Sequence, residues 1–294
     1  MITRRSLLVG TAGLAAATVS GVAIAKPGKP KPTPTPTPTG GTVSPSPGVT
    51  ASSTPTTNVL FFEDFAAGNF NKWGQLQWQT SGVVRNGDGN LYDGTSDYSG
   101  AIVNGGTGHE QAARFELRDG DNPFGSGTER TEISTPGPDD PALEPVQGDL
   151  WRVEWDMKFE SSFPVPVAAS GFCVIHQWHG SGSTSSPPVC LDVDSDDVVY
   201  LANNDASGYK RTAVQSVQRN VWQHWEYEVF FHPNAATGWV TLKVDGVVKI
   251  NHEARATMIP AEPSNYFKTG IYRDSDNSAT AILWIDNVKI TDLA

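Results

Sequence analysis

The chain has 294 residues, of which 18% are charged, and a formal net charge of −11. All 32 Asp and Glu residues follow residue 57, whereas 5 of the 21 Lys and Arg residues precede it, which leaves residues 58–294 with a net charge of −16. A surface this acidic argues against nucleic acid and anionic membranes as partners.

Residues 1–25 have the features of an export signal. Arg4 and Arg5 precede an apolar stretch rich in Ala and Gly, which ends at the cleavage-type sequence Ala23-Ile24-Ala25. The paired arginines favour the twin-arginine route. The stretch falls short of the ~20 strongly apolar residues that a membrane-spanning helix requires. We therefore expect a secreted bacterial protein whose mature form does not insert into a membrane.

Residues 26–57 consist mainly of Pro, Thr, Ser and Gly. Such a segment cannot bury apolar area, which predicts an extended, disordered linker. It serves either as a tether from the cell surface or as a simple spacer. Residues 58–294 are sufficient for one domain with a single core, and we expect a monomer.

Short segments with strand character follow one another through this domain, and helical periodicity is nearly absent. Gly, Pro, Asn and Asp separate the segments, and Asp245-Gly246 is a typical hairpin turn. This pattern predicts an all-β fold, an antiparallel two-sheet β-jelly roll of the concanavalin-like sandwich type with a concave substrate groove. The expected strands cover 59–62, 111–117, 130–134, 151–159, 172–179, 198–201, 222–231, 238–244, 266–273 and 279–290.

Cys173 and Cys190 are the two cysteines of the chain. In an exported protein such a pair predicts one disulfide. The alternative is a catalytic thiol, but no activating base accompanies either cysteine in the sequence.

The expected strand at 266–273 has one polar face. Alternation places Tyr266, Lys268 and Tyr272 together around Gly270, while the other face is largely apolar. Two phenols and an ammonium group around a small residue suit the floor of a polar groove that binds an anionic polysaccharide.

Two further strands carry the same kind of face. Gln177 and His179 share one face of the strand at 172–179, and His176 is expected on the opposite, packed face. Arg130 and Glu132 share one face of the strand at 130–134. If the sandwich brings the three strands together, their polar faces form one site.

This set of side chains fits β-elimination of a uronic acid polymer. Arg130 and Gln177 can neutralise the carboxylate that acidifies the C5 proton, and His179 can remove that proton. Tyr272 can protonate the departing O4, or take both roles, because C5–H and O4 lie on the same side of a glucuronate ring. Lys268 can contact substrate or lower the pKa of Tyr272. The chemistry requires no organic cofactor.

The sequence resembles known polysaccharide lyases over most of residues 58–294. Gln177-Trp178-His179 and the segment Y-F-K-x-G-x-Y at 266–272 resemble the heparin lyase I-like and glucuronan lyase family. With Arg130-x-Glu132 added, the set is similar to that of jelly-roll alginate lyases. The resemblance implies a β-jelly roll and eliminative cleavage, with His179 and Tyr272 as the acid–base pair and Gln177 beside them.

Two positions depart from the alginate lyases. Asp274 stands where they tend to carry Gln, and Ser134 stands where they tend to carry a second Arg. The acidity of the domain also argues against a highly sulfated substrate such as heparin. These differences favour glucuronan, with alginate, heparin and heparan-type polymers as alternatives.

Secondary roles are expected for several other residues. Tyr266 and Lys268 should contact substrate, and Glu132 should pair with Arg130 or Lys268 and orient it. Arg273 is either a further substrate contact or a structural residue, because a regular strand turns it away from Tyr272.

Three carboxylates suggest a structural calcium site. Glu63 and Asp64 lie near the start of the domain and Asp286 in its last strand, and oxygen ligands suit Ca²⁺. They could equally be ordinary surface carboxylates.

Two other classes of protein compete with a lyase. Glu154, Asp156 and Glu160 share one strand face, but their E-x-D-x-x-x-E spacing differs from that of jelly-roll glycoside hydrolases, so solvent-facing carboxylates are expected. A non-catalytic carbohydrate-binding jelly roll would keep Tyr266 without needing both His179 and Tyr272.

Overall fold

The computed structural model describes residues 57–78, 82–85, 98–125, 127–135, 140–167, 171–182, 186–205, 208–260 and 262–293. The chain divides into two units, Met1–Ala51 and Ser52–Ala294, and the described residues all belong to the second. The expected export signal, and the expected linker up to residue 56, lie outside the described residues.

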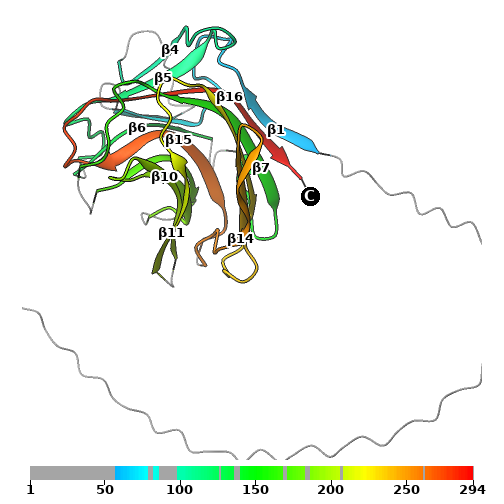
Figure 1. Ribbon diagram of the computed structural model, residues 1–294. Helices are drawn as coiled ribbons and strands as arrows, with labels where there is room; N and C mark the ends of the chain where they lie inside the picture. The colour runs from blue at the N-terminus through cyan, green and yellow to red at the C-terminus, as the bar shows by residue number, and fades with distance from the viewer. Residues whose placement is uncertain are drawn as a thin grey trace, which may run out of the picture. The chain divides into compact units, whose positions relative to one another are not determined.

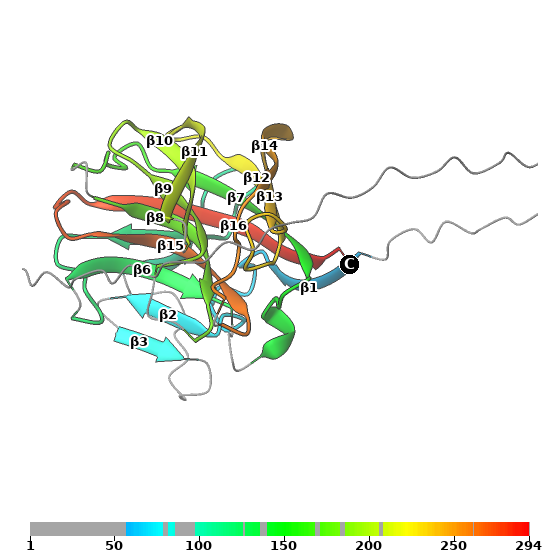
Figure 2. The ribbon, with the colours of Figure 1, turned by 90° about the horizontal axis from the view of Figure 1, so that it is seen from below.

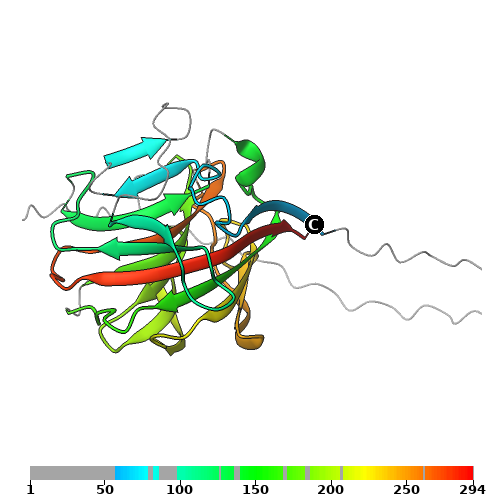
Figure 3. The same ribbon diagram turned by 90° about the horizontal axis from the view of Figure 1, so that it is seen from above.

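Two antiparallel sheets form the described part of the chain (Figure 1). The first has the order β14 (Val247–Ala254), β13 (Trp239–Val244), β12 (Gln223–Phe230), β7 (Leu150–Phe159), β16 (Ala281–Asp292), β5 (Ala112–Leu117) and β4 (Gly100–Val103), and β1 (Asn58–Glu63) also pairs with β16. Figure 3 shows β16 running through the middle of this sheet.

The second sheet carries the strands expected to form the site (Figure 2). Its order is β11 (Gly208–Ser216), β10 (Val198–Asp205), β9 (Val189–Val193), β8 (Cys173–Gly180), β15 (Asn265–Asp274), β6 (Thr128–Ser134), β2 (Gln75–Trp78) and β3 (Gly82–Arg85). A 3₁₀ turn, η2 (Pro141–Leu143), is the one helical element of the described residues, and no described helix is long and apolar enough to cross a membrane. The predicted all-β sandwich is confirmed.

Each of the ten expected strands corresponds to an observed strand, with ends that differ by up to four residues. The Asp245-Gly246 turn joins β13 to β14, and both residues have positive φ, as a tight hairpin turn requires. The strands β2, β3, β4, β9, β11 and β14 were not among the expected ranges. Three of them have only four residues, too few for alternation to be recognised.

The core lies between the two sheets. On β7, every second residue is buried, and Trp155 stacks on Trp225 of the neighbouring strand β12 at 6.0 Å. From the opposite sheet, His176 stacks on Trp155 at 4.5 Å, and burial lowers the pKa of His176 to about 3. A neutral, buried His176 is a packing residue, as predicted. Its neighbours Gln177 and His179 therefore face away from the core.

The predicted disulfide is wrong, because Cys173 and Cys190 are both free and buried. Cys190 pairs with Gln177 on β8, four residues along that strand from Cys173. At ~3.3 Å per residue, four residues span roughly 13 Å, which is beyond the ~7 Å limit for two bridged Cα atoms. The two side chains also belong to different apolar clusters.

Candidate active site

The three strands with polar faces lie side by side, with β15 between β8 and β6. Lys268 on β15 is opposite Gln177 on β8 and opposite Ser134 on β6. Tyr266 is opposite His179, and Tyr272 is opposite Arg130. The predicted convergence is therefore present. We call the following seven residues the polar face: Arg130, Glu132, Gln177, His179, Tyr266, Lys268 and Tyr272.

Glu132 is the centre of the polar face. One of its carboxylate oxygens accepts a hydrogen bond from the Gln177 side-chain amide, and the other accepts one from Lys268 Nζ at 2.8 Å. Arg130 Nη1 lies 3.6 Å from Glu132 Oε2. Glu132 was expected to pair with Arg130 or Lys268, and it contacts both.

Charge balance explains how these groups are buried together. Burial alone raises the pKa of Glu132, but Lys268 and Arg130 outweigh it, and the pKa of Glu132 falls below its ordinary value. Burial lowers the pKa of Lys268, and the charge of Glu132 opposes that shift. With Arg130 also charged, the cluster has two positive groups and one negative group. A net charge of one positive unit can be balanced by one carboxylate anion.

The ring of His179 is oriented by the backbone. Its Nδ1 lies 2.9 Å from the carbonyl oxygen of Gly180, which assigns the ring proton to Nδ1 and leaves Nε2 with a free lone pair. Burial, and then the charge of Lys268, lowers the pKa of His179. A neutral imidazole with an unprotonated Nε2 is the form that a general base requires.

Tyr272 packs between two neighbours. The Arg130 guanidinium lies 4.1 Å from the centre of the Tyr272 ring, and the centre of the Phe172 ring lies 4.8 Å from the same point. Such packing fixes the direction of the phenol. The Tyr272 hydroxyl is therefore carried by an ordered ring beside a cation.

His179 and Tyr272 mark the two ends of the polar face. Tyr266, which is opposite His179, precedes Tyr272 by six residues, so their Cα atoms are up to roughly 20 Å apart along an extended strand. Lys268 and Gln177 lie between them.

Tyr266 lies beside His179, with the two ring centres 5.3 Å apart and the planes tilted by 40°. The ring is half-buried. It lies on the same face as Lys268, and its contact with substrate stays a prediction.

Arg273 does not face the substrate side. It is buried, and its guanidinium makes hydrogen bonds to Glu129 Oε2, with Nε at 2.8 Å, and to the backbone carbonyl of Ala279. Of the two roles that the sequence left open for Arg273, the structural one fits this placement.

Gln77 on β2 also belongs to the site, and sequence reasoning missed it. Its Oε1 accepts hydrogen bonds from Arg130 Nη1 and from Lys268 Nζ, both at 3.2 Å. Gln77 thereby joins the two cations that Glu132 balances. Alternation in Gln75-Leu76-Gln77 was the available signal, but a four-residue strand is too short to reveal it.

Gly270 allows β15 and β6 to approach each other closely. Its φ is 132°, and a Cβ atom at this position would lie 2.2 Å from the carbonyl oxygen of Thr131 and 2.8 Å from Cα of Glu132. The glycine is therefore needed for the backbone contact that carries Glu132 to the polar face.

We expect Gly270→Ala to destabilise the protein by more than ~2 kcal/mol, because it combines a backbone clash with an unfavourable φ. Urea unfolding would measure the loss. Gly68→Ala is the matched control, since Gly68 also has positive φ, 67°, but no atom within 4 Å of an added Cβ. Equal losses for the two variants would show that the clash has no effect.

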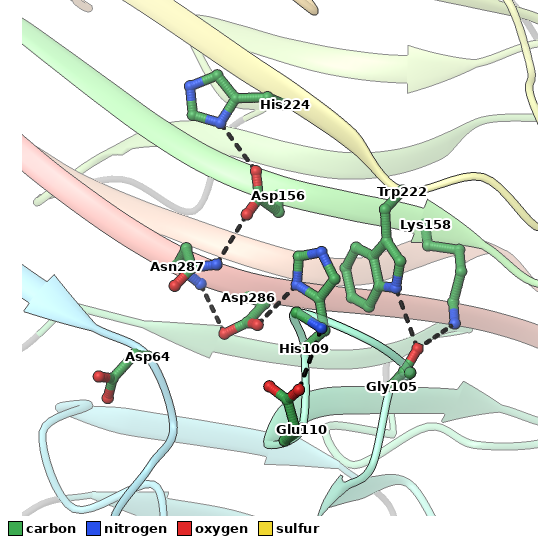
Figure 4. A network of polar contacts seen from close by, with 12 residues as sticks. Asp64, Gly105, His109, Glu110, Asp156, Lys158, Trp222, His224, Asp286 and Asn287 are labelled. Carbon is green, nitrogen blue, oxygen red and sulfur yellow. Dashed lines mark hydrogen bonds and ion pairs between the residues drawn. The ribbon is translucent and has the colours of Figure 1, made fainter.

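The three carboxylates of the expected calcium site have other partners. Glu63 accepts hydrogen bonds from the backbone of Phe65 and from Lys72, and Asp286 accepts one from His109 Nδ1 at 2.8 Å. Figure 4 shows Asp286 in this network with Asp64 apart from it. Within the described ranges no group of three or more His, Cys, Asp or Glu side chains is arranged to hold a metal ion. Calcium binding stays a prediction.

The carboxylates of the hydrolase alternative lie on the first sheet. Asp156 pairs with His224 and accepts a hydrogen bond from the Asn287 side chain, both at 2.8 Å (Figure 4). Glu154 pairs with Lys289 at 2.7 Å, and Glu160 accepts from Trp284 Nε1 at 3.0 Å. Glu154 and Asp156 alternate with the buried residues of β7, on the face of the first sheet away from the core, and Glu160 directly follows the strand.

The fold and the site together define a two-sheet β-sandwich with an imidazole, a phenol and a cationic cluster on one face. The polysaccharide lyase family model matches residues 65–289. The chain therefore belongs to the polysaccharide lyase family, and it is an enzyme.

Solved structures agree on the fold. The chain is similar to the endo-β-1,4-glucuronan lyase of the fungus Trichoderma reesei, with a TM-score of 0.56 and 13% identity over 78% of this chain and 94% of that chain. It is also similar to the alginate lyase AlyA1 of Zobellia galactanivorans, with a TM-score of 0.52 and 16% identity over 76% of this chain and 95% of that chain. At such identities the likeness shows the fold alone. No curated protein matches the sequence.

Proposed function

We propose that this lyase is secreted and cleaves a uronic acid polymer by β-elimination, with glucuronan as the preferred substrate. One observation carries the proposal: a cationic cluster with one net positive charge lies between a neutral imidazole and an ordered phenol. The export features of residues 1–25 support secretion.

Five residues of the polar face have a role in the reaction. Arg130, with Gln177 and Lys268 beside it, neutralises the substrate carboxylate and so acidifies the C5 proton. His179 Nε2 takes that proton, and the C–H electron pair forms the C4–C5 double bond. The C4–O4 bond breaks, its electron pair passes to O4, and the Tyr272 hydroxyl protonates O4. Proton exchange with water restores both side chains.

The choice of glucuronan rests on the two departures from the alginate lyase pattern. Ser134 is buried opposite Lys268, so no second arginine reaches the cluster from that position. Asp274 ends β15 where a glutamine is usual in alginate lyases.

Ultraviolet absorbance is the test, because the C4–C5 double bond is conjugated with the carboxylate and hydrolysis cannot form it. The purified protein would be incubated separately with glucuronan, alginate, heparin, heparan sulfate and hyaluronan. We expect the largest increase with glucuronan. A larger increase in absorbance with another polymer would make that polymer the preferred substrate in place of glucuronan. No increase with any of them would reject the proposed function.

The pH dependence of kcat/KM should report on His179. A base must be neutral to act, so activity should rise with pH through the His179 pKa, and burial places this pKa below the ordinary value of 6.5. We expect the pH profile of kcat/KM to have an acidic limb with its midpoint below pH 6.5. The residual activity of His179→Gln should lack this limb. An unchanged limb in that variant would assign the base to another group.

A further inference from the structure

Phe124 lies next to the polar face but is not part of the acid–base set. It belongs to the connection between β5 and β6, and 47% of its surface is exposed. The Arg130 guanidinium lies 4.7 Å from the centre of its ring and 4.1 Å from the centre of the Tyr272 ring. Arg130 is therefore in contact with two aromatic rings, and one of them is half open to solvent.

Buried polar groups hold this connection in place. Glu129 accepts a hydrogen bond from the backbone of Gly120 at 2.6 Å and is paired with Arg273. Asp121 accepts one from the backbone of Arg118 at 2.7 Å. The backbone carbonyl of Asp121 accepts a hydrogen bond from Arg130 N at 3.0 Å. An exposed aromatic side chain is thus presented from an anchored segment.

We propose that Phe124 is a sugar-stacking residue of the substrate site, at the end of the polar face that carries Tyr272. This inference rests on the proposed function and deepens it. The Arg130 guanidinium lies close to the Phe124 ring, but nearly half of the Phe124 side chain is exposed. Part of its apolar surface is therefore free to contact a ligand. The C–H groups on one face of a pyranose ring are complementary to that area.

The chemistry of a uronate ring fits this position. Its carboxylate is attached at the ring edge and would reach Arg130, while the ring itself covers Phe124. Its glycosidic oxygen would then point toward Tyr272. A polymer subunit that makes all three contacts is a pyranose with an acidic substituent. A neutral sugar lacks the group that binds Arg130, and an isolated carboxylate lacks the ring that covers Phe124.

Four variants test the inference. Phe124→Ala removes the ring, and Phe124→Trp keeps an aromatic face. Phe124→Leu keeps an apolar side chain beside Arg130 but has no aromatic face. Phe62→Ala is the matched control, because Phe62 is 46% exposed but lies on β1 of the first sheet. The kcat and KM would be measured on the polymer that shows ultraviolet turnover. Binding of the same polymer would be measured separately with Tyr272→Phe, alone and combined with each of the four variants.

We expect Phe124→Ala to raise KM and to weaken binding about five- to tenfold, with kcat changed less than ~2-fold. Phe124→Trp should restore binding, Phe124→Leu should not, and Phe62→Ala should match the wild type. The inference is overturned if alanine has no effect, if leucine restores function, or if Phe62→Ala has the same effect. A loss confined to kcat would also overturn it, because that result assigns Phe124 to the positioning of Arg130.

The binding measurement separates this inference from the proposed function. A wild-type protein without turnover on any polymer would reject the lyase reaction proposed above. If it still bound a uronate polymer, and Phe124→Ala weakened that binding, the stacking role of Phe124 would be supported without the lyase reaction. If no uronate polymer bound, both would fail.

Discussion

Replacing Tyr272 with phenylalanine should lower kcat by a factor of about 10²–10⁴, the range for removal of a general acid. The variant removes only the hydroxyl. The ring keeps its contacts with Arg130 and Phe172, so neither the orientation of the guanidinium nor the packing should change. Because O4 then leaves as an unprotonated alkoxide, the chemical step rather than binding should be impaired.

Tyr266→Phe provides the matched control for this experiment. Tyr266 lies on the same strand and the same face, beside His179. Removing its hydroxyl should reduce kcat/KM by less than ~10-fold, because no proton transfer is assigned to it. Ultraviolet turnover would measure both variants, and thermal unfolding would verify their folds. A Tyr272→Phe enzyme with more than a tenth of the wild-type kcat would refute the assigned role.

Glu132→Gln should have the largest effect on stability. The amide keeps the shape of the side chain but removes the charge that balances Lys268 and Arg130. An uncompensated buried charge typically lowers the free energy of unfolding by about 3–5 kcal/mol. The same change should reduce activity, since an amide has one acceptor oxygen in place of two, so that either Gln177 or Lys268 loses the acceptor that orients it.

The pH dependence of stability gives this prediction a sign. Because the pKa of Glu132 is lower in the folded protein than its ordinary value of 4.5, its contribution is present above pH 4.5. It is lost as the pH falls through the lowered pKa. The difference in unfolding free energy between wild type and Glu132→Gln should therefore be full at neutral pH and decrease in strong acid.

Glu226→Gln is the control for the charge effect. Glu226 pairs with Lys243 at 2.9 Å on the first sheet, where both side chains are partly exposed. Loss of such a pair should lower the unfolding free energy by less than ~1 kcal/mol. Urea unfolding at several pH values would compare the variants. Equal losses of unfolding free energy for Glu132→Gln and Glu226→Gln would show that the buried charge cluster contributes no more than an exposed ion pair.

Local periodicity made much of the fold predictable. Strand character repeats every two residues, so alternation alone placed Gln177 and His179 on one face and His176 on the other. The ten expected strands were found for the same reason. Short strands such as β2 span too few residues for a repeat, which is why Gln77 was missed.

Contacts between distant segments were not predictable in this way. Cys173 and Cys190 suggested a disulfide on composition, but the pairing of β8 with β9 separates them along the strands. Arg273 could be a substrate contact or a structural residue until its pairing with Glu129 was seen. Phe124 gave no signal, because nothing in its neighbourhood indicates that the connection reaches Arg130.

The sequence by itself determined the all-β class, the polar faces of three strands and the side chains that fit β-elimination, because these depend on residue type and local spacing. Only the tertiary structure decided that β15 lies between β8 and β6. It also decided that Glu132 balances two cations and that Gln77 joins them. The reason is that strand neighbours are selected by the packing of the whole sandwich, which no single segment encodes.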